Sequence, residues 1–257
     1  MRTRRPAEVA EAFHLAFLTA FAAVADPRSF ALKGGGNLRF FFGSLRFSED
    51  IDLDAFAAEP GVFSLKVEKA FESLNLAKLL ATLGIRVTHL NPKDRTSTKE
   101  KWVIGLSHPG VGAPVYTRVE ISHRAYGLEA YVAVEPVTSQ AVAAYAPLPA
   151  PLIGHYLPGG AVIQKIVALQ GRRATQPRDV FDLDHLFRRY PETVRPSVLD
   201  AATLEAAIAR VYEIDSAAYR SKVVSFLDPS VRAALDTADA WGSMQVRVVE
   251  ALEAMLP

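Results

Sequence analysis

The first part of the chain carries apolar residues at the spacing of one helix face, and these are Val9, Phe13, Phe17, Phe21 and Val24. This period predicts an amphipathic helix with an aromatic stripe toward the core, and Asp26-Pro27 should end it. The elements expected next are, in order, a strand at 29–32, a glycine turn at 33–36, a short helix at 37–42, a polar loop at 43–50 and a strand at 51–56. A helix at 64–83 that stops at Gly84 should follow, and then three strands at 85–90, 102–107 and 115–122.

The pattern changes after residue 145. Residues 146–160 contain four prolines and three glycines, and this density of chain breakers indicates a domain boundary. Beyond it the apolar spacing is helical throughout, at 161–169, 180–187, 198–211 and 231–256. We therefore predict an α+β protein in which residues 1–150 form a mixed β-sheet core with flanking helices and residues 151–257 form an α-helical domain.

Composition narrows the choice of function classes. Half of the residues are hydrophobic, cysteine is absent and the net charge is +1. Disulfides and thiolate metal sites are therefore excluded. The apolar stretch at 7–25 is interrupted by Glu8, Glu11 and His14, unlike the core of a signal peptide, so a soluble, cytoplasmic protein is expected. Nucleic acid could be bound only through local basic patches, for which the candidates are Lys93, Arg95, Lys99, Lys101, Arg172 and Arg173.

The most informative stretch runs from Lys33-Gly34-Gly35-Gly36 to Asp50-Ile51-Asp52. Glycines allow backbone N–H groups to approach a triphosphate, and a helix that starts behind them adds a positive dipole. Asp50 and Asp52 are two apart on a predicted strand, so their carboxylates face the same side. Two hard oxygen ligands beside a phosphate cradle are what nucleotide-bound Mg²⁺ (or Mn²⁺) requires. An ordinary surface strand after a glycine turn is the alternative.

Glu120 is a candidate third metal ligand. It lies between Val119 and Ile121 in the strand predicted at 115–122, so it should point away from the core that its neighbours face. It would then face either the metal site or solvent, and the sequence leaves both possibilities open.

These residues resemble a known family. Gly35-Gly36 followed by Gly43-x-x-Arg46-x-Ser48-x-Asp50-Ile51-Asp52 is similar to the first motif of the AbiEii/AbiGii toxin group of nucleotidyltransferases, which share the DNA polymerase β-like fold. A second stretch, Lys165-x-x-Ala168-Leu169 and then Pro177-Arg178-Asp179-x-x-Asp182-Leu183, resembles the C-terminal motif of that family. The resemblance implies a nucleotidyltransferase-like sheet core and a helical domain that completes the active site.

The resemblance also implies roles for individual residues. Asp50 and Asp52 would bind metal, and Gly35, Gly36, Arg46 and Ser48 would bind the nucleotide. Lys165 would contact the triphosphate, with Asp179 or Asp182 as a further catalytic acid. Asn37 departs from the family pattern, which often has threonine or serine after the glycine pair. From the residues alone, Lys165 could reach solvent along an apolar helix, Asp182 could pair with Arg178 on a helix surface, and Asp179 could be a helix N-terminal acid.

The expected activity is metal-dependent transfer of a nucleoside monophosphate from an NTP to an acceptor. By resemblance, the acceptor would be an RNA such as the 3′ end of tRNA, and the protein would be the toxin of a toxin–antitoxin or abortive-infection system with a cognate antitoxin and no membrane partner. The alternatives are transfer to a protein hydroxyl or a small molecule, and a non-catalytic nucleotide- or RNA-binding module.

Overall fold

The computed structural model describes residues 4–56, 61–96, 98–123, 127–193 and 199–256. The chain forms two compact units. Unit 1 consists of Met1–Gly43 and Phe47–Tyr156, and unit 2 consists of Ser44–Arg46 and Leu157–Pro257. The short segment Ser44–Arg46 therefore belongs to the second unit although it lies within the first half of the sequence.

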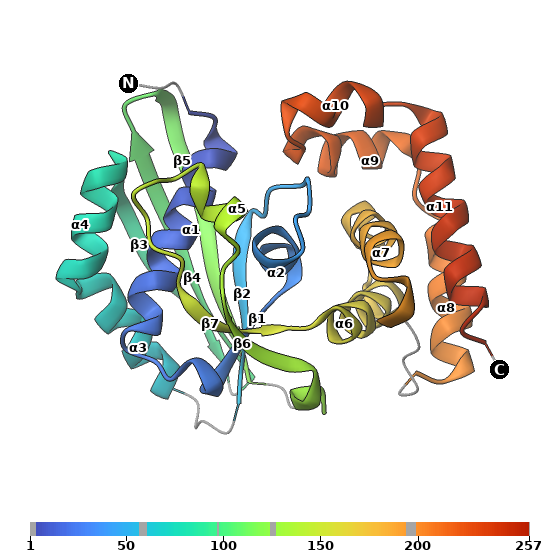
Figure 1. Cartoon of the computed structure of the whole chain (residues 1–257), viewed down its shortest axis with the longest axis horizontal. Helices are drawn as coiled ribbons and strands as arrows, with labels where there is room; N and C mark the ends of the chain where they lie inside the picture. Colours follow the sequence, from blue (N-terminus) through green and yellow to red (C-terminus); the bar gives the residue numbers. More distant parts are fainter. Residues whose placement is uncertain (1–3, 57–60, 97, 124–126, 194–198, 257) are drawn as a thin grey trace. The chain divides into compact units, whose positions relative to one another are not determined.

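Unit 1 is a mixed β-sheet with helices, as the sequence predicts (Figure 1). Its helices are α1 (Pro6–Ala22), α2 (Gly34–Phe41), α3 (Val62–Glu72), α4 (Leu74–Leu83) and α5 (Ser139–Ala143). Its strands are β1 (Phe30–Lys33), β2 (Asp50–Ala55), β3 (Arg86–Thr96), β4 (Lys99–His108), β5 (Val111–Ser122), β6 (Val132–Pro136) and β7 (Leu152–Tyr156). The strand order is β3-β4-β5-β2-β1-β7-β6. The β2–β5 and β1–β7 pairs are parallel and the other pairs are antiparallel.

The core of unit 1 lies between one face of the sheet and the helices α1, α3 and α4. The aromatic stripe of α1 is fully buried, and Phe17 stacks on Phe21 with ring centroids 5.6 Å apart. Ile51 of β2 and Val119 of β5 contribute to the same cluster. Because side chains alternate along a strand, the neighbouring acids of β2 and β5 lie on the opposite face of the sheet.

One helix of unit 1 differs from the prediction. The helix expected at 64–83 is two helices, because Ser73 has extended backbone and its hydroxyl accepts a hydrogen bond from the N–H of Leu76, which starts α4. Serine competes with helix continuation in this way and favours a cap. The end at Gly84 is confirmed, with a left-handed φ of 68°.

Strand β7 lies inside the segment that its prolines and glycines mark as a domain boundary. A Cβ on Gly154 would come within 2.0 Å of the carbonyl oxygen of Phe30 and 2.5 Å of that of Pro27. Gly154 is therefore required by the close approach of another backbone and does not break the chain here. The density of glycine and proline therefore concealed β7 in the sequence pattern, and its partner β6 at Val132–Pro136 was also not predicted.

Unit 2 is helical, as expected. Its helices are α6 (Pro158–Gly171), α7 (Pro177–Arg189), α8 (Ala201–Val211), α9 (Ser216–Lys222), α10 (Pro229–Leu235) and α11 (Ala238–Glu253). The sequence pattern missed α9 and joined α10 to α11, which Thr237 separates by capping the N–H of Ala240. Within the described part of the chain, no helix combines the length and the apolar character needed to cross a bilayer.

The segment Ser44–Arg46 is fastened to unit 2 by its backbone. Arg46 forms an isolated antiparallel bridge with Leu227. The N–H of Asp228 donates to the carbonyl oxygen of Leu45 at 3.1 Å. Part of the first sequence motif is thus structurally joined to the helical unit.

Candidate functional site

Unit 1 carries an array of acids on the sheet face opposite its core. Asp50 and Asp52 of β2 share one face of the strand, as predicted, and Ile51 between them is buried on the other face. In the parallel β2–β5 pair, Asp50 is in register with Arg118, and Asp52 is in register with Glu120. The structure therefore brings the three predicted metal ligands to one face of two adjacent strands.

The start of helix α2 lies against Asp52. The glycines expected to form a separate turn are instead the first residues of α2, which begins at Gly34. Gly34 has a left-handed φ of 66°, and a Cβ placed on it would lie 2.9 Å from Oδ2 of Asp52. Glycine is needed here both for the backbone conformation and for the space that the carboxylate occupies. Gly35 and Gly36 follow in the first turn of the helix, whereas the sequence pattern indicated no separate role for Gly34.

The acids of this face have basic partners that the sequence did not reveal. Arg118 donates from Nε to Oδ1 of Asp50 at 2.8 Å, and its Nη2 contacts Oδ2 of the same carboxylate. The hydrogen bond to Asp50 raises the pKa of Arg118, and the charges of Asp52 and Glu49 act in the same direction. Lys99 of β4 pairs with Glu120 at 2.6 Å.

A buried cluster continues this face along β2. Asp54 has no exposed surface. It pairs with Lys33, and its Oδ2 accepts a hydrogen bond from the Tyr156 hydroxyl at 2.8 Å. Lys33 also donates to the Ser122 hydroxyl at 3.0 Å. The cluster fixes the last residue before the glycines, because an ammonium with two buried partners loses its freedom to move.

The backbone at Glu49 and Asp50 is held by side-chain hydroxyl groups. The Ser48 hydroxyl donates to the carbonyl oxygen of Asp50 at 2.9 Å. The Thr117 hydroxyl donates to the carbonyl oxygen of Glu49 and accepts from Nε2 of His14, both at 2.7 Å. Burial lowers the pKa of His14 to about 4, against an opposing effect of Asp50, so His14 is neutral at pH 7. Ser48, predicted to contact phosphate, thus supports the β2 backbone in this structure.

The donor set of β2 fits a hard divalent metal. Asp50 and Asp52 offer carboxylate oxygens from one strand face, and Gly34 leaves Asp52 the space to keep its position. Among the described residues, no three Asp, Glu or His side chains converge as a preformed metal cluster. Two protein carboxylates plus oxygens from a bound nucleotide are nevertheless a common ligand set for Mg²⁺.

Unit 2 contains the second set of predicted residues, joined in one buried network. Lys165 of α6 contacts Oδ1 of Asp179 at 3.1 Å and Oδ2 of Asp182 at 2.6 Å. Arg46 donates from Nη2 to both oxygens of Asp182, at 3.2 and 3.0 Å. Arg172 reaches the other oxygen of Asp179 at 2.8 Å. Asp179 and Asp182 are fully buried, and Lys165 is 8% exposed.

The network changes the interpretation of these charges. Lys165 does not extend to solvent, and the partners of Asp182 are the buried Arg46 and Lys165. Burial would raise the pKa of Asp182, but the positive charges of Arg46 and Lys165 outweigh it and lower the pKa to about 2. Asp179 does lie in the first turn of its helix, and it is also part of the network. Arg46, predicted to bind nucleotide, is directed at Asp182 in this structure.

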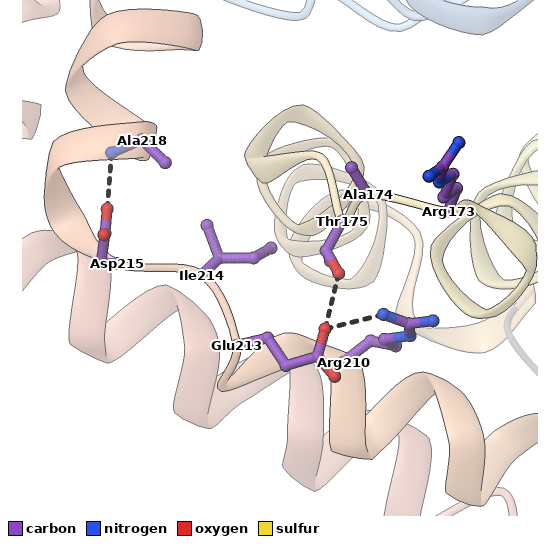
Figure 2. Close-up of a pocket in the computed structure, with 8 residues that line it drawn as sticks. All are labelled: Arg173, Ala174, Thr175, Arg210, Glu213, Ile214, Asp215 and Ala218. Carbon is purple, nitrogen blue, oxygen red and sulfur yellow. Dashed lines mark hydrogen bonds and ion pairs between the residues drawn. The ribbon is translucent and has the colours of Figure 1, made fainter.

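A pocket in unit 2 contains none of the predicted catalytic or metal-binding residues. Its volume is about 240 Å³, and Figure 2 shows Arg210, Glu213 and Thr175 at its wall. Glu213 accepts from Thr175 at 2.8 Å and pairs with Arg210 at 2.9 Å. Arg173 also lines the pocket, and no ion pair is found for it among the described residues.

Comparison with solved structures finds chains of similar fold. The chain is similar to JHP933 from Helicobacter pylori, with a TM-score of 0.62 and 19% identity over 98% of this chain and 96% of that chain. It is also similar to a candidate nucleotidyltransferase from H. pylori, with a TM-score of 0.61 and 18% identity over 99% of both chains. At these identities the likeness establishes the fold. Among curated protein sequences no significant match is found.

The sequence itself establishes the family. The model of the family described as "Nucleotidyl transferase AbiEii toxin, Type IV TA system" matches residues 16–254. The chain belongs to this family and is a nucleotidyltransferase of the toxin type. The resemblance drawn from the two motifs is thereby confirmed, and so is the expectation of an enzyme. Membership in a type IV toxin–antitoxin family also implies an antitoxin partner.

Proposed function

We propose that this toxin transfers a nucleoside monophosphate from an NTP to the 3′ end of an RNA such as tRNA, with Mg²⁺ or Mn²⁺ held by Asp50 and Asp52. Transfer to this end of tRNA would block aminoacylation and arrest growth, which suits a toxin–antitoxin or abortive-infection system. One observation carries the proposal: two carboxylates share a strand face, and a glycine leaves room for one of them.

The residues of unit 1 on and beside β2 have separate roles in this proposal. The metal would neutralise phosphate charge and favour in-line attack by the acceptor hydroxyl. Asp50 and Asp52 would hold it, with Glu120 as a further candidate ligand in register with Asp52. The N-terminus of α2, with Gly35 and Gly36, would bind phosphate through backbone N–H groups and the helix dipole. Ser48 would keep Asp50 in position through its backbone hydrogen bond.

The residues of unit 2 keep the roles that the family motif suggests. We propose Lys165 as the side chain that contacts the triphosphate and Asp182 as the catalytic acid of the second motif, with Asp179 as the alternative. Arg46 is proposed to act with them by holding Asp182. Lys165 and Arg46 also offset the charge of the two acids, so any catalytic role is combined with a structural one.

An RNA acceptor is favoured by an exposed aromatic side chain on the acidic face. Tyr116 lies two residues before Arg118 on β5 and is 65% exposed. An exposed ring on a flat strand can stack on a base whatever its identity. Among the basic residues predicted to bind RNA, Lys99 and Arg172 are in ion pairs. Lys101 and Arg173 remain the better candidates for phosphate contacts, whereas the side chains of Lys93 and Arg95 lie outside the described residues.

The acceptor is identified by incubation with each labelled NTP, Mg²⁺, total RNA and a protein extract. Label is expected in the tRNA pool. Label in protein or in small molecules would show that the acceptor is not RNA.

Asp50→Ala and Asp52→Ala should each lower transfer at least about a thousandfold, because a lost metal ligand removes several kcal/mol of transition-state stabilisation. Glu129, an exposed acid of unit 1, provides the matched control, and Glu129→Ala should retain activity.

Growth of bacteria that express the chain gives the biological readout. The wild-type protein should arrest growth and the Asp50→Ala protein should not. Arrest by both would mean that toxicity does not depend on transfer. Affinity for tRNA should fall with salt, with a log–log slope of about −0.7 per phosphate contacted, and affinity independent of salt would contradict nucleic acid as the partner.

A further inference from the structure

Arg118 occupies the coordinating oxygens of Asp50. Its Nε and Nη2 each contact a different oxygen of this carboxylate, so the guanidinium fork uses both. A carboxylate engaged in this way has no oxygen left uncovered on the side where the arginine lies. The two residues face each other in register on adjacent parallel strands, which holds the pair together in the folded sheet.

The ion pair between Arg118 and Asp50 is also able to open. Its side chain is 44% exposed, whereas that of Asp50 is 15% exposed. The exposed guanidinium can regain water when the pair opens, whereas the more enclosed carboxylate needs another cation in its place. Glu49 and Asp52 add negative charge around Arg118, and the same negative charge attracts a divalent cation.

We propose that Arg118 is an internal counter-cation that competes with the divalent metal for Asp50, so that the metal binds Asp50 only when the guanidinium withdraws. This inference rests on the proposed metal site and goes beyond it. Arg118 is a positioning residue: it holds Asp50 in place and compensates its charge before metal binds. It also sets the metal concentration at which the site fills.

Lys99 provides a matched comparison on the same sheet face. It pairs with Glu120 at 2.6 Å, and its side chain is 41% exposed. Removing Lys99 also deletes one positive charge near the acids, but it frees neither oxygen of Asp50. Because its partner Glu120 is itself a candidate ligand, the comparison is made in a Glu120→Gln background. A general effect of charge would therefore appear in both variants, whereas direct competition would appear only with Arg118.

The test is Mn²⁺ binding to the full chain, with free Mn²⁺ counted by electron paramagnetic resonance. Arg118→Gln should bind Mn²⁺ on the order of tenfold more tightly than the wild type, since a charge-assisted bond no longer has to be broken. In a Glu120→Gln background, where no candidate ligand is uncovered, Lys99→Gln should change affinity by less than about twofold. Arg118→Lys, which keeps the charge without the fork, should lie between wild type and Arg118→Gln and guards against misfolding of the neutral variant. Wild-type affinity equal to or tighter than that of Arg118→Gln would overturn the proposal.

A second readout follows the guanidinium itself. The Nε–H resonance of Arg118, assigned by its absence in Arg118→Gln, should shift when diamagnetic Mg²⁺ is added. A resonance unchanged at saturating Mg²⁺ would overturn the competition. Asp50→Asn separates this outcome from failure of the proposed function: if it binds Mn²⁺ as well as the wild type, the metal site itself is wrongly placed.

Discussion

Arg46 donates from Nη2 to both carboxylate oxygens of Asp182, at 3.2 and 3.0 Å, although 136 positions separate the two residues in the sequence. Arg46 belongs to the first sequence motif and Asp182 to the second. The pair lies within unit 2, to which the segment Ser44–Arg46 contributes. One function of the first motif is therefore to supply a buried cation to the helical unit.

Asp182→Ala should destabilise unit 2 strongly. The change leaves the Arg46 and Lys165 charges without their shared carboxylate in a buried position, which costs about 3 to 5 kcal/mol. Urea unfolding followed by circular dichroism measures the loss. Asp184→Ala is the control from the same helix, since its partners Arg188 and Arg247 are 65% and 39% exposed and can regain water. Its cost should be about 1 kcal/mol, and equal costs for the two variants would contradict a special role of the network.

Stability should depend on Asp182 at acid pH. The pKa of this carboxyl is lowered from 3.8 to about 2 in the folded protein. A lowered pKa stabilises the folded state above pH 4, and this contribution is lost as the pH falls from about 4 to about 2. The loss is about 2 kcal/mol. Wild type should lose this amount relative to Asp182→Asn between pH 5 and pH 2, and parallel pH profiles of the two proteins would be inconsistent with the charged network.

Gly34→Ala should reduce transfer by displacing Asp52. The new Cβ would lie 2.9 Å from Oδ2 of Asp52, and the left-handed φ of 66° adds backbone strain of about 1 kcal/mol. Gly43→Ala is the matched control, because Gly43 has the same φ of 66° and a Cβ added to it would meet no atom within 4 Å. Both variants should lose similar stability, measured by thermal unfolding, and only Gly34→Ala should lose most of its activity. If the two variants have similar activity, the contact with Asp52 is not the cause of any loss.

Lys165→Ala should lower turnover more than Arg172→Ala does. Both substitutions remove a cation that contacts Asp179, but only Lys165 is proposed to contact the triphosphate. Loss of an ammonium that offsets charge on the departing pyrophosphate is expected to lower kcat by about a hundredfold. The assay is run at a temperature where unfolding curves show both variants folded. Equal kcat values would make Lys165 a structural member of the network.

The sequence by itself determined the features that depend on short spacing. Asp50 and Asp52 share a face because a strand repeats every two residues, and the aromatic stripe of α1 is buried because a helix repeats every 3.6 residues. The α+β class follows from the same periodicities. The family resemblance follows from two short motifs, at 35–52 and 165–183. Helix caps were harder to predict from the sequence. Ser73 divides into two helices a segment that the apolar pattern predicts as one.

Tertiary structure alone decided the partners of the charged residues. Arg118, Lys99 and Arg46 reach their acids from other strands or from a distant segment, and neither their spacing nor their type indicates which acid each will meet. The role of Gly154 could not be predicted either, because glycine is required there only by the nearby backbone of Phe30. Long-range pairing is set by how the sheet and helices pack in three dimensions, and periodicity along the chain carries no information about it.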